Sequence, residues 1–233
     1  MTATAPLRLV IALLIALPIT LLHAREKQAG SRPNIIFMLA DDMGWSQLGF
    51  NGGKGDLTPH IDQFAKEGMR LTKFYTHSVC APTRGAFLTG RYAFRNWMDW
   101  RSEDFGKPSY LKALGLTLPH NKRGEPTRRI HALDSNERTI AEALKEADYN
   151  TALVGKWHCG EWLEEHLPMG QGFMHQYGHY AWGIDYYTKT IQHNAPARFA
   201  VYDWHRNQQP LQEDGYATDL FAAEAERVIA AQN

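Results

Sequence analysis

The sequence predicts an α/β fold in which a mostly parallel sheet is flanked by helices. Two short segments, residues 35–40 (IIFMLA) and 151–154 (TALV), are unbroken or nearly unbroken apolar runs. Such runs are typical of strands buried on both faces of a parallel sheet. Segments with helical periodicity alternate with them along the chain, as expected where crossover helices join the strands.

The first predicted helix extends from Thr58 to Gly68. Thr58 is a candidate N-cap, Pro59 suits the first turn, and Gly68 is a typical helix end. The apolar stripe of this helix consists of Ile61, Phe64 and Ala65. A short strand is expected to follow at residues 69–74.

Two more helices are predicted, one beginning near Ser135 and Asn136 and one from Asp219 to about Ala231. Apolar residues recur on one face of each helix. In the first they are Ile140, Ala143, Leu144 and Ala147, and in the second Phe221, Ala225, Val228 and Ile229. Residues 95–134 are rich in Pro, Gly and charge with weak periodicity, so we expect a long surface excursion near a functional site.

Composition and charge exclude several classes of protein. The 25 Lys and Arg residues balance 25 Asp and Glu residues, and a neutral chain has no electrostatic footprint for nucleic acid or an anionic membrane surface. Hydrophobic residues at 44% and charged residues at 21% are globular values, which exclude disorder, collagen and coiled coil. The two cysteines, Cys80 and Cys159, are too few for a disulfide-rich scaffold and form no CxxC zinc motif.

The N-terminus has the pattern of a secretory signal peptide. Arg8 precedes an apolar run at residues 9–22, and Ala24 offers a small residue at a cleavage point. The run is shorter than the roughly 20 residues of a transmembrane helix, although an uncleaved anchor remains an alternative. We therefore expect a signal peptide at 1–24, a linker at 25–32, a folded region at 33–233 and a secreted or periplasmic location without membrane attachment after cleavage.

Two acidic residues, Asp41 and Asp42, directly follow the first predicted strand. Open α/β sheets bind ligands at the carboxyl ends of their strands. Adjacent carboxylates repel one another unless a cation holds them, and oxygen ligands favour calcium or magnesium over zinc. The alternative is that one carboxylate caps the next turn and the other is solvated.

A second cluster surrounds Cys80. Pro82 can occupy the first turn of a helix, which would place Cys80 just before an N-terminus whose unpaired amides favour negative charge. Arg84, one turn further on, could direct its guanidinium at the same anion. A lone cysteine before a helix can equally be a buried small apolar residue.

The third cluster, residues 155–160 (GKWHCG), directly follows the strand predicted at 151–154. Lys156 and His158 are two residues apart, so in extended backbone both would face one side and could address one anionic group. The alternative is a surface lysine and a hydrogen-bonded loop histidine. The other histidines have no convincing metal-ligand spacing and are expected mostly on the surface or in loops: His77, His166, His175, His179, His193 and His205.

These clusters resemble the signatures of the type I, formylglycine-dependent sulfatases of the alkaline phosphatase superfamily. Cys80, Pro82 and Arg84 match the Cys-x-Pro-x-Arg core residue by residue, and residues 88–91 (LTGR) continue the match. Residues 155–160 resemble the second signature, Gly-Lys-Trp-His-x-Gly. The resemblance extends from about residue 33 to 233 and favours the arylsulfatase A and B group.

The resemblance implies a set of roles. In the family a maturation enzyme oxidises the core cysteine to formylglycine, whose hydrated aldehyde is the nucleophile, and Cys80 takes this position. Asp41, Asp42 and residue 80 would bind a calcium or magnesium ion. Arg84 would stabilise the hydrate, Lys156 would hold the sulfate, and His158 would act as the base. One departure is Asp148, where the family usually has glycine.

The resemblance also implies that the site is incomplete. The family adds an Asp-Asn pair, a second histidine and a second lysine from its second half, and this sequence has no late Asp-Asn string. Calcium takes about six to eight oxygen ligands, more than Asp41, Asp42 and residue 80 supply. We therefore expect residues 33–233 to be the N-terminal part of a sulfatase catalytic domain, with an alkaline-phosphatase-like sheet incomplete at its C-terminus and no turnover by this chain alone.

Three functions remain open on the sequence. The first is a secreted arylsulfatase-like hydrolase of sulfuric ester bonds, with a sulfated glycan as the expected substrate. The second is a phosphodiesterase or phosphonate monoester hydrolase of the same superfamily. The third is a non-catalytic protein that binds sulfated glycans. Aromatic residues that could stack on sugar rings also suit core packing, and they are Trp97, Trp100, Trp157, Trp162, Trp182, Trp204, Tyr177, Tyr180, Tyr186 and Tyr187.

Overall fold

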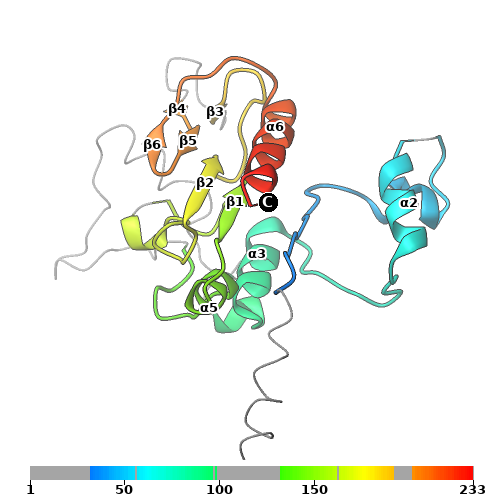
Figure 1. The fold of residues 1–233 in the computed structure, drawn as a ribbon, viewed down its shortest axis with the longest axis horizontal. Helices are drawn as coiled ribbons and strands as arrows, with labels where there is room; N and C mark the ends of the chain where they lie inside the picture. Colours follow the sequence, from blue (N-terminus) through cyan, green and yellow to red (C-terminus); the bar gives the residue numbers. More distant parts are fainter. Residues whose placement is uncertain are drawn as a thin grey trace, which may run out of the picture. The chain divides into compact units, whose positions relative to one another are not determined.

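A computed structural model describes residues 32–55, 57–96, 98, 132–161, 163–191 and 201–232. The chain divides into two compact units, Met1–Gly68 and Met69–Asn233 (Figure 1). The predicted signal peptide lies outside the described residues, as do residues 99–131 of the predicted surface excursion.

The first unit contains two 3-10 helices, η2 (Trp45–Gln47) and η3 (Gly49–Asn51), and the helix α2 (Pro59–Glu67). The predicted helix at 58–68 is thus confirmed. The hydroxyl of Thr58 accepts a hydrogen bond from Gly49 N at 3.0 Å and lies 3.2 Å from the carboxylate of Asp62. The same carboxylate accepts from Phe50 N at 2.9 Å, so these polar contacts fasten η3 to the start of α2.

The two strands predicted at residues 35–40 and 69–74 are wrong for this structure. Neither segment is paired with another strand in the described part of the chain, and their apolar side chains are exposed, Met38 by 77%. An apolar run becomes a buried strand only where neighbouring strands pair with its backbone and other elements cover its faces. No described element gives these segments both.

The second unit contains a four-stranded sheet in the order β1 (Ala152–Val154), β2 (His175–Gly178), β5 (His205–Arg206) and β6 (Gln209–Pro210). The β1–β2 pair is parallel, with Leu153 opposite Gln176, and the other two pairs are antiparallel. A separate antiparallel pair joins β3 (Thr190–Ile191) to β4 (Val201–Tyr202). Strand β1 confirms the strand predicted at 151–154, and the architecture is α/β.

The helix predicted from Ser135 begins later, as α5 (Ile140–Glu146). Thr139 and Glu142 form a reciprocal capping box, with Thr139 Oγ1 accepting from Glu142 N at 3.1 Å and Glu142 Oε2 accepting from Thr139 N at 2.7 Å. The side chain of Asp134 instead accepts from Asn136 N at 2.9 Å, which closes a turn before the helix. The polar residues at 134–136 therefore form a turn, and the helix starts after the capping threonine.

The helix α3 (Cys80–Thr89) contacts α5 and packs over the core of the second unit. This core continues through the short helix η4 (Ala93–Arg95) to the segment that follows β1. Its buried members are Ala81, Leu88, Ala93, Met98, Leu133, Trp157, Cys159 and Tyr180. The helix and the segment after β1, both expected to carry chemistry, thus share one core.

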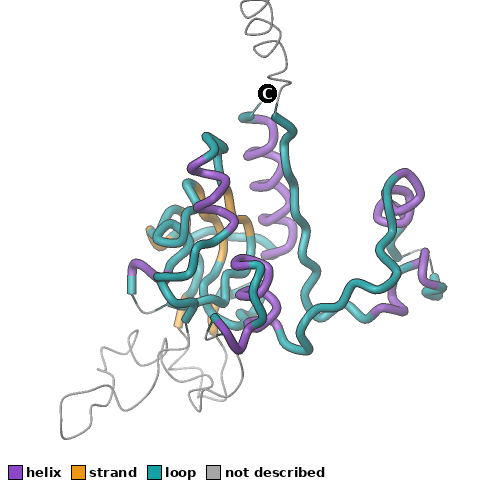
Figure 2. Tube along the Cα trace, turned by 90° about the horizontal axis from the view of Figure 1, so that it is seen from below, coloured by secondary structure: helices purple, strands orange, loops and turns teal. Residues whose placement is uncertain are grey.

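The helix α6 (Ala217–Ala230) confirms the last predicted helix and packs along β1 and β2 (Figures 1 and 2). Phe221 stacks on Trp204, with ring centroids 5.0 Å apart, in a second apolar cluster. Two details differ from the predicted apolar face, because Ile229 is exposed and Glu224 is buried. The charge partners of Glu224 explain why a carboxylate occupies the inner face.

Glu224 accepts hydrogen bonds from three cationic or titratable side chains. His175 Nε2 on β2 and Arg206 Nη1 on β5 both lie 2.7 Å from its carboxylate, and Arg227 Nη2 lies at 2.6 Å. Burial alone would raise the pKa of Glu224, but the hydrogen bonds from Arg227, Arg206 and His175 outweigh burial and lower it to about 2. This carboxylate therefore connects α6 to two strands.

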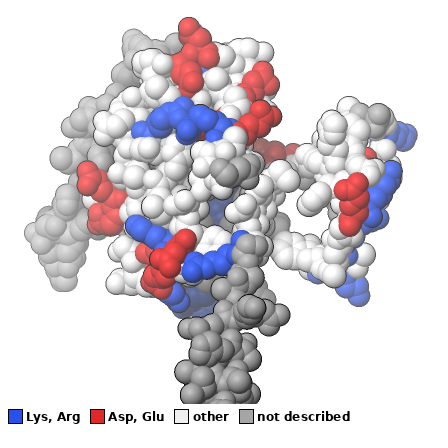
Figure 3. Space-filling model, viewed as in Figure 1, with Lys and Arg blue, Asp and Glu red and all other residues white. Residues whose placement is uncertain are grey.

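On the face in Figure 3, basic and acidic side chains of the second unit lie next to one another rather than in separate fields. This mixture agrees with the formal net charge of 0. Within the described ranges, no helix combines the length and the apolar character needed to cross a membrane.

We predict that Glu224→Gln lowers the free energy of unfolding by about 2 kcal/mol at pH 7, because buried charge-assisted hydrogen bonds are weakened. The folded pKa lies below the ordinary value of 4.5, so the carboxylate's contribution is complete above pH 4.5 and is lost as the pH falls toward 2. Urea unfolding followed by circular dichroism from pH 7 to pH 2 should show the difference from wild type shrinking in that interval.

The matched control for this prediction is Glu226→Gln, an exposed position on the same helix. It should unfold like the wild type at every pH. Equal stability of the two variants at pH 7 would contradict the assigned role of Glu224.

Candidate active site

Cys80 is the first residue of α3, and Val79 is the N-cap in extended conformation. The first helical hydrogen bond of this segment runs from Thr83 N to Val79 O at 3.1 Å. Pro82 has no N–H, so the amides of Cys80 and Ala81 are the donors that the first turn leaves for another group. The half-buried thiol of Cys80 thus lies at the positive end of the helix dipole.

Arg84 joins α3 to the segment that follows β1. Its Nη1 donates to the carbonyl of Lys156 at 2.5 Å, across 72 residues of sequence. The guanidinium is half-buried and comes from the same helix as Cys80. This contact holds the helix N-terminus and the Lys156 segment against each other.

The segment from Gly155 to Gly160 continues the parallel pairing of β1 with β2. Gly155 N donates to Tyr177 O at 2.8 Å, Trp157 N to His179 O at 2.9 Å, and His158 N to Tyr180 O at 3.0 Å. Its backbone is therefore fixed by the residues that follow the neighbouring strand.

Trp157 determines how this segment faces the rest of the unit. Its side chain is buried, donates from Nε1 to His166 O at 2.9 Å and packs edge-on against Phe173. Lys156 and His158, on either side of the inward tryptophan, are only partly buried. The expected regular extended backbone is wrong at His158, which adopts φ 55°, so alternation alone does not define the direction of its imidazole.

Gly160 shows why the second signature ends in glycine. Its φ of 126° is unfavourable for any residue with a side chain. A Cβ at this position would also lie 2.7 Å from Ala132 Cβ and 2.8 Å from His166 Cβ. The absence of a side chain at Gly160 therefore lets the backbone turn in close contact with Ala132 and His166. Asp148, which stands where the family usually has glycine, adopts φ 61° in a turn. Glycine adopts this conformation with less strain, which accounts for the family's preference at this position.

Cys159 is fully buried beneath the charged groups. Burial raises the pKa of its thiol to about 12, while the charges of Arg84 and Lys156 act in the opposite direction and Cys80 adds to the increase. Cys80, Arg84 and Lys156 are therefore all close enough to influence one buried sulfur atom. Neither cysteine is in a disulfide, and the neutral thiol of Cys159 is a poor nucleophile.

His179 is a residue of the loop after β2, and its Nδ1 lies 3.1 Å from Ala181 O, which agrees with the expectation of a hydrogen-bonded loop histidine. Its burial and its closeness to the same cations were not predicted. Burial lowers its pKa to about 4, opposed by Asp203 and reinforced by Lys156 and Arg84. A neutral imidazole therefore lies within electrostatic range of the two cations.

Asp203 is the buried carboxylate beside His179. It accepts hydrogen bonds from Tyr180 N at 3.1 Å, Ala181 N at 2.8 Å and His205 Nε2 at 3.1 Å. Burial would raise the pKa of Asp203, but these hydrogen bonds and the nearby His179 lower it. His179 follows β2 and Asp203 follows β4, but no short motif joins them, so local spacing gave no signal for this pair.

Two other histidines differ from the expected surface or loop positions, because His175 lies in β2 and His205 in β5. His175 binds Glu224 and His205 stacks on Tyr180 with ring centroids 4.4 Å apart, whereas His193 lies outside the described residues. The aromatic residues divide in a similar way. Trp157, Trp204, Tyr177 and Tyr180 are buried, Trp182, Tyr186 and Tyr187 are exposed, and Trp97, Trp100 and Trp162 lie outside the described residues.

The predicted metal ligands belong to both units. Asp41 and Asp42 are exposed carboxylates of the first unit, and Asp42 adopts φ 54°, which breaks the strict alternation of side chains along an extended segment. Carboxylate oxygens fit a hard divalent cation, although two residues supply only part of its shell. Among the described residues, no group of three or more His, Cys, Asp or Glu side chains is arranged to hold a metal ion.

Four of the predicted site residues, Cys80, Arg84, Lys156 and His158, thus come from two adjoining segments of the second unit. Together they offer a helix N-terminus, a guanidinium, an ammonium and an imidazole. This set of donors suits an oxyanion better than any neutral group.

Comparison with known proteins shows similarity to sulfatases along most of the chain. The sulfatase family model matches residues 33–233. Human steryl-sulfatase is 37% identical over 159 residues, covering 66% of this chain and 24% of its own. The arylsulfatase of Klebsiella aerogenes is 30% identical over 204 residues, covering 86% of this chain and 39% of its own.

Solved structures agree with the sequence comparisons. The crystal structure of Ps i-CgsB has a TM-score of 0.69 and 27% identity, covering 87% of this chain and 42% of its own. The same protein in complex with k-i-k-neocarrahexaose has a TM-score of 0.60 and 26% identity over 82% of this chain and 40% of its own. The chain spans about a quarter to two fifths of the length of the two relatives described above. With the family model matched from residue 33 to residue 233, the chain belongs to the sulfatase family.

Proposed function

We propose that the protein to which these residues belong hydrolyses sulfuric ester bonds through residue 80. The observation that carries this proposal is the position of Cys80 at the first turn of α3, on the helix whose Arg84 binds the Lys156 carbonyl. The nucleophile's residue and the oxyanion donors are thereby held by one packed core. Membership in the sulfatase family supplies the reaction class.

Residue 80 requires chemical conversion for this role. In this conversion the maturation enzyme would use an external oxidant such as dioxygen to take two electrons from the Cys80 side chain, and the thiol sulfur would leave as sulfide, giving an aldehyde. Addition of water to the aldehyde would supply a hydroxyl nucleophile for attack on the sulfur of the ester. The amides at the start of α3 and the Arg84 guanidinium are suited to hold negative charge on that group. Cys159 is unsuited to the same role because it is buried and neutral.

Lys156 is proposed to bind the sulfate group, and His158 is proposed to act as a general base. Lys156 carries a fixed positive charge on the segment that Arg84 holds, so it would bind a sulfate oxygen. His158 has its backbone fixed by Tyr180 and would accept the proton of the remaining residue-80 hydroxyl after the alcohol has left. The sulfated hydrate would then collapse to the aldehyde and release sulfate. The carbonyl of the neutral His179 accepts from Trp157 N in the same segment, and the buried Asp203 binds the amides of Tyr180 and Ala181.

Asp41 and Asp42, with residue 80, are proposed to hold a calcium or magnesium ion that neutralises a sulfate oxygen. Their oxygen donors fit such an ion, but six to eight ligands are typical for calcium. The chain spans only part of the length of its relatives. We therefore infer that turnover requires further metal ligands, which would come from regions of the sulfatase relatives that these 233 residues do not cover.

A sulfated glycan is the proposed substrate class. The related Ps i-CgsB was solved with a neocarrahexaose, which shows that a relative of this fold binds an oligosaccharide of that type. We also propose export through residues 1–24 to a secreted or periplasmic location, and conversion of Cys80 by a formylglycine-generating maturation enzyme. The N-terminal pattern of Arg8 followed by an apolar run supports export.

Conversion should occur at Cys80 and not at Cys159 when the protein is produced with the maturation enzyme. The reason is that Pro82 and Arg84 flank only Cys80 at the required spacing, and Cys159 is enclosed once the chain folds. Peptide mass spectrometry, with a hydrazide probe for aldehydes, distinguishes the two positions. An unmodified thiol at 80 under these conditions, or an aldehyde at 159, contradicts the assignment.

Turnover of an aryl sulfate should depend on the same residues when the protein is expressed from its complete coding sequence. Lys156→Ala should lower kcat/KM by about 10²–10³, the usual consequence of removing one donor to a developing oxyanion. Cys80→Ala and a divalent-ion chelator should abolish turnover, whereas exposed Lys145→Ala should have no effect.

The same assay decides between reaction classes. Equal rates for wild type and Cys80→Ala would refute the proposed nucleophile. Hydrolysis of a phosphate diester without hydrolysis of a sulfate ester would refute the proposed substrate class.

A further inference from the structure

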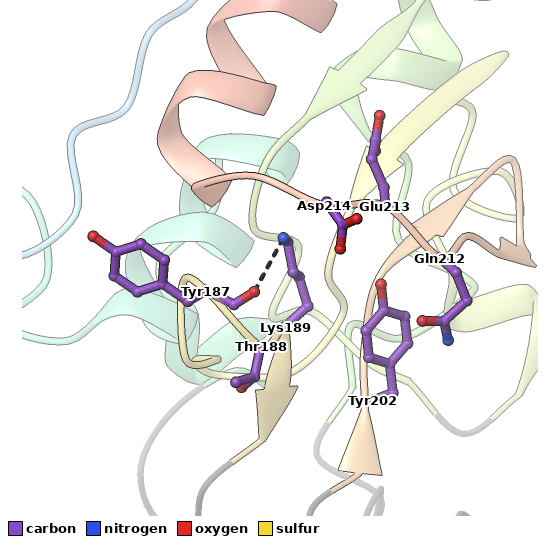
Figure 4. Close-up of a pocket in the computed structure, with 7 residues that line it drawn as sticks. All are labelled: Tyr187, Thr188, Lys189, Tyr202, Gln212, Glu213 and Asp214. Carbon is purple, nitrogen blue, oxygen red and sulfur yellow. Dashed lines mark hydrogen bonds between the residues drawn. The ribbon is translucent and has the colours of Figure 1, made fainter.

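A polar pocket lies in the part of the second unit built by β3, β4 and the segment before α6 (Figure 4). Its volume of about 280 Å³ lies just below the roughly 300–1,000 Å³ of pockets that hold drug-sized ligands, so it suits a smaller group. None of the residues proposed for sulfate chemistry lines it. The lining residues are Tyr187, Thr188, Lys189, Tyr202, Gln212, Glu213 and Asp214.

Three consecutive side chains of this pocket have hydrogen-bonding capacity to spare. Gln212 and Asp214 make no side-chain hydrogen bond to another described residue. Glu213 uses one oxygen, Oε2, to accept from Tyr177 Oη at 2.5 Å and from Trp204 Nε1 at 3.1 Å. Its other oxygen has no hydrogen bond within the described ranges, so the pocket offers carboxylate and amide groups of the kind that bind hydroxyls.

Exposed aromatic rings adjoin these polar groups. Tyr187 is 74% exposed, and in Figure 4 its ring points outward from the edge of the pocket, away from the other six labelled side chains. Its ring centroid lies 5.0 Å from that of Tyr216, which in turn lies 5.6 Å from that of Tyr186. All three rings are exposed, so together they form an aromatic surface beside a polar pocket.

Buried contacts hold this aromatic surface in place. The ammonium of Lys189 is buried and donates to Tyr187 O at 3.1 Å and to Gly215 O at 2.5 Å. Ala217 N donates to Tyr186 O at 2.9 Å. These bonds join the backbone of the segment with Tyr186 and Tyr187 to that of the segment with Tyr216, so little backbone ordering is needed when a ligand binds.

We propose that this pocket and the tyrosines Tyr186, Tyr187 and Tyr216 form a saccharide-binding site that is separate from the proposed catalytic residues. Tyrosine faces pack against the C–H faces of a sugar ring, while Gln212, Glu213 and Asp214 bind its hydroxyls. This combination of apolar faces and planar polar groups fits a sugar better than a purely apolar partner.

The charges of the pocket select the kind of sugar. Glu213 and Asp214 contribute two carboxylates, and the single ammonium of Lys189 is already engaged with two backbone carbonyls. A sulfated or carboxylated ring would therefore meet net repulsion. The ligand is an uncharged glycosyl residue, such as an unsulfated unit of a longer glycan.

The test is a binding titration of a chemically desulfated carrageenan hexasaccharide by isothermal calorimetry and saturation-transfer NMR. All proteins carry Cys80→Ala, so binding is measured without conversion or turnover at residue 80. Tyr187→Ala should weaken binding by about 10-fold, equivalent to about 1.4 kcal/mol, which lies within the range for aromatic contacts. Gln212→Ala should weaken it in the same direction.

Tyr92→Ala is the matched control, because Tyr92 is 68% exposed but does not line the pocket. It should bind like the parent. Asp214→Asn should bind the original sulfated hexasaccharide more tightly than the parent protein does, because one repelling charge is removed.

Two results would overturn the site. One is the absence of saccharide binding by the parent protein, as expected if the rings contact a protein partner instead. The other is unchanged affinity in Tyr187→Ala. Either result leaves the aldehyde assignment at residue 80 intact, so the failure of this inference is distinct from the failure of the proposed function.

Discussion

The hydrogen bond from Arg84 to the Lys156 carbonyl connects the two segments on which the proposed chemistry depends. One segment is the first turn of α3 with Cys80, and the other is the continuation of β1 with Lys156 and His158. Side chains on separate loops would lose entropy on assembly, whereas these are held before any ligand arrives. The buried Trp157 and Cys159 make the arrangement one side of a packed core.

Residues under this arrangement keep its charges available to a ligand. A protonated imidazole at position 179 would add a buried positive charge near the partly buried Arg84 and Lys156, but burial keeps His179 neutral. Asp203 keeps its negative charge in the core because backbone amides and His205 bind it. The positive charges of Arg84 and Lys156 therefore stay available to an oxyanion, and no further positive charge from His179 is buried beside them.

Local signals predicted the parts of the structure that depend on local chemistry. Pro82 identified the first turn of α3, and the capping and apolar pattern of residues 58–68 identified α2. The apolar runs at 35–40 and 69–74 predicted strands that are not paired among the described residues, since pairing depends on partners far along the chain. Asp203 and Glu224 were missed for the same reason, because the residues that stabilise each buried carboxylate lie mainly on other segments.

The most direct test of the account is whether the unconverted site binds inorganic sulfate beside Cys80. The measurement is the rate of iodoacetamide alkylation at each cysteine, resolved by peptide mass spectrometry, as sulfate is titrated at constant ionic strength. The account predicts that Cys80 reacts and is protected by sulfate in a saturable way, that Lys156→Ala loses this protection, and that buried Cys159 stays unlabelled until the protein unfolds. A Cys80 rate that is independent of sulfate, or labelling of Cys159 in the folded protein, would contradict it.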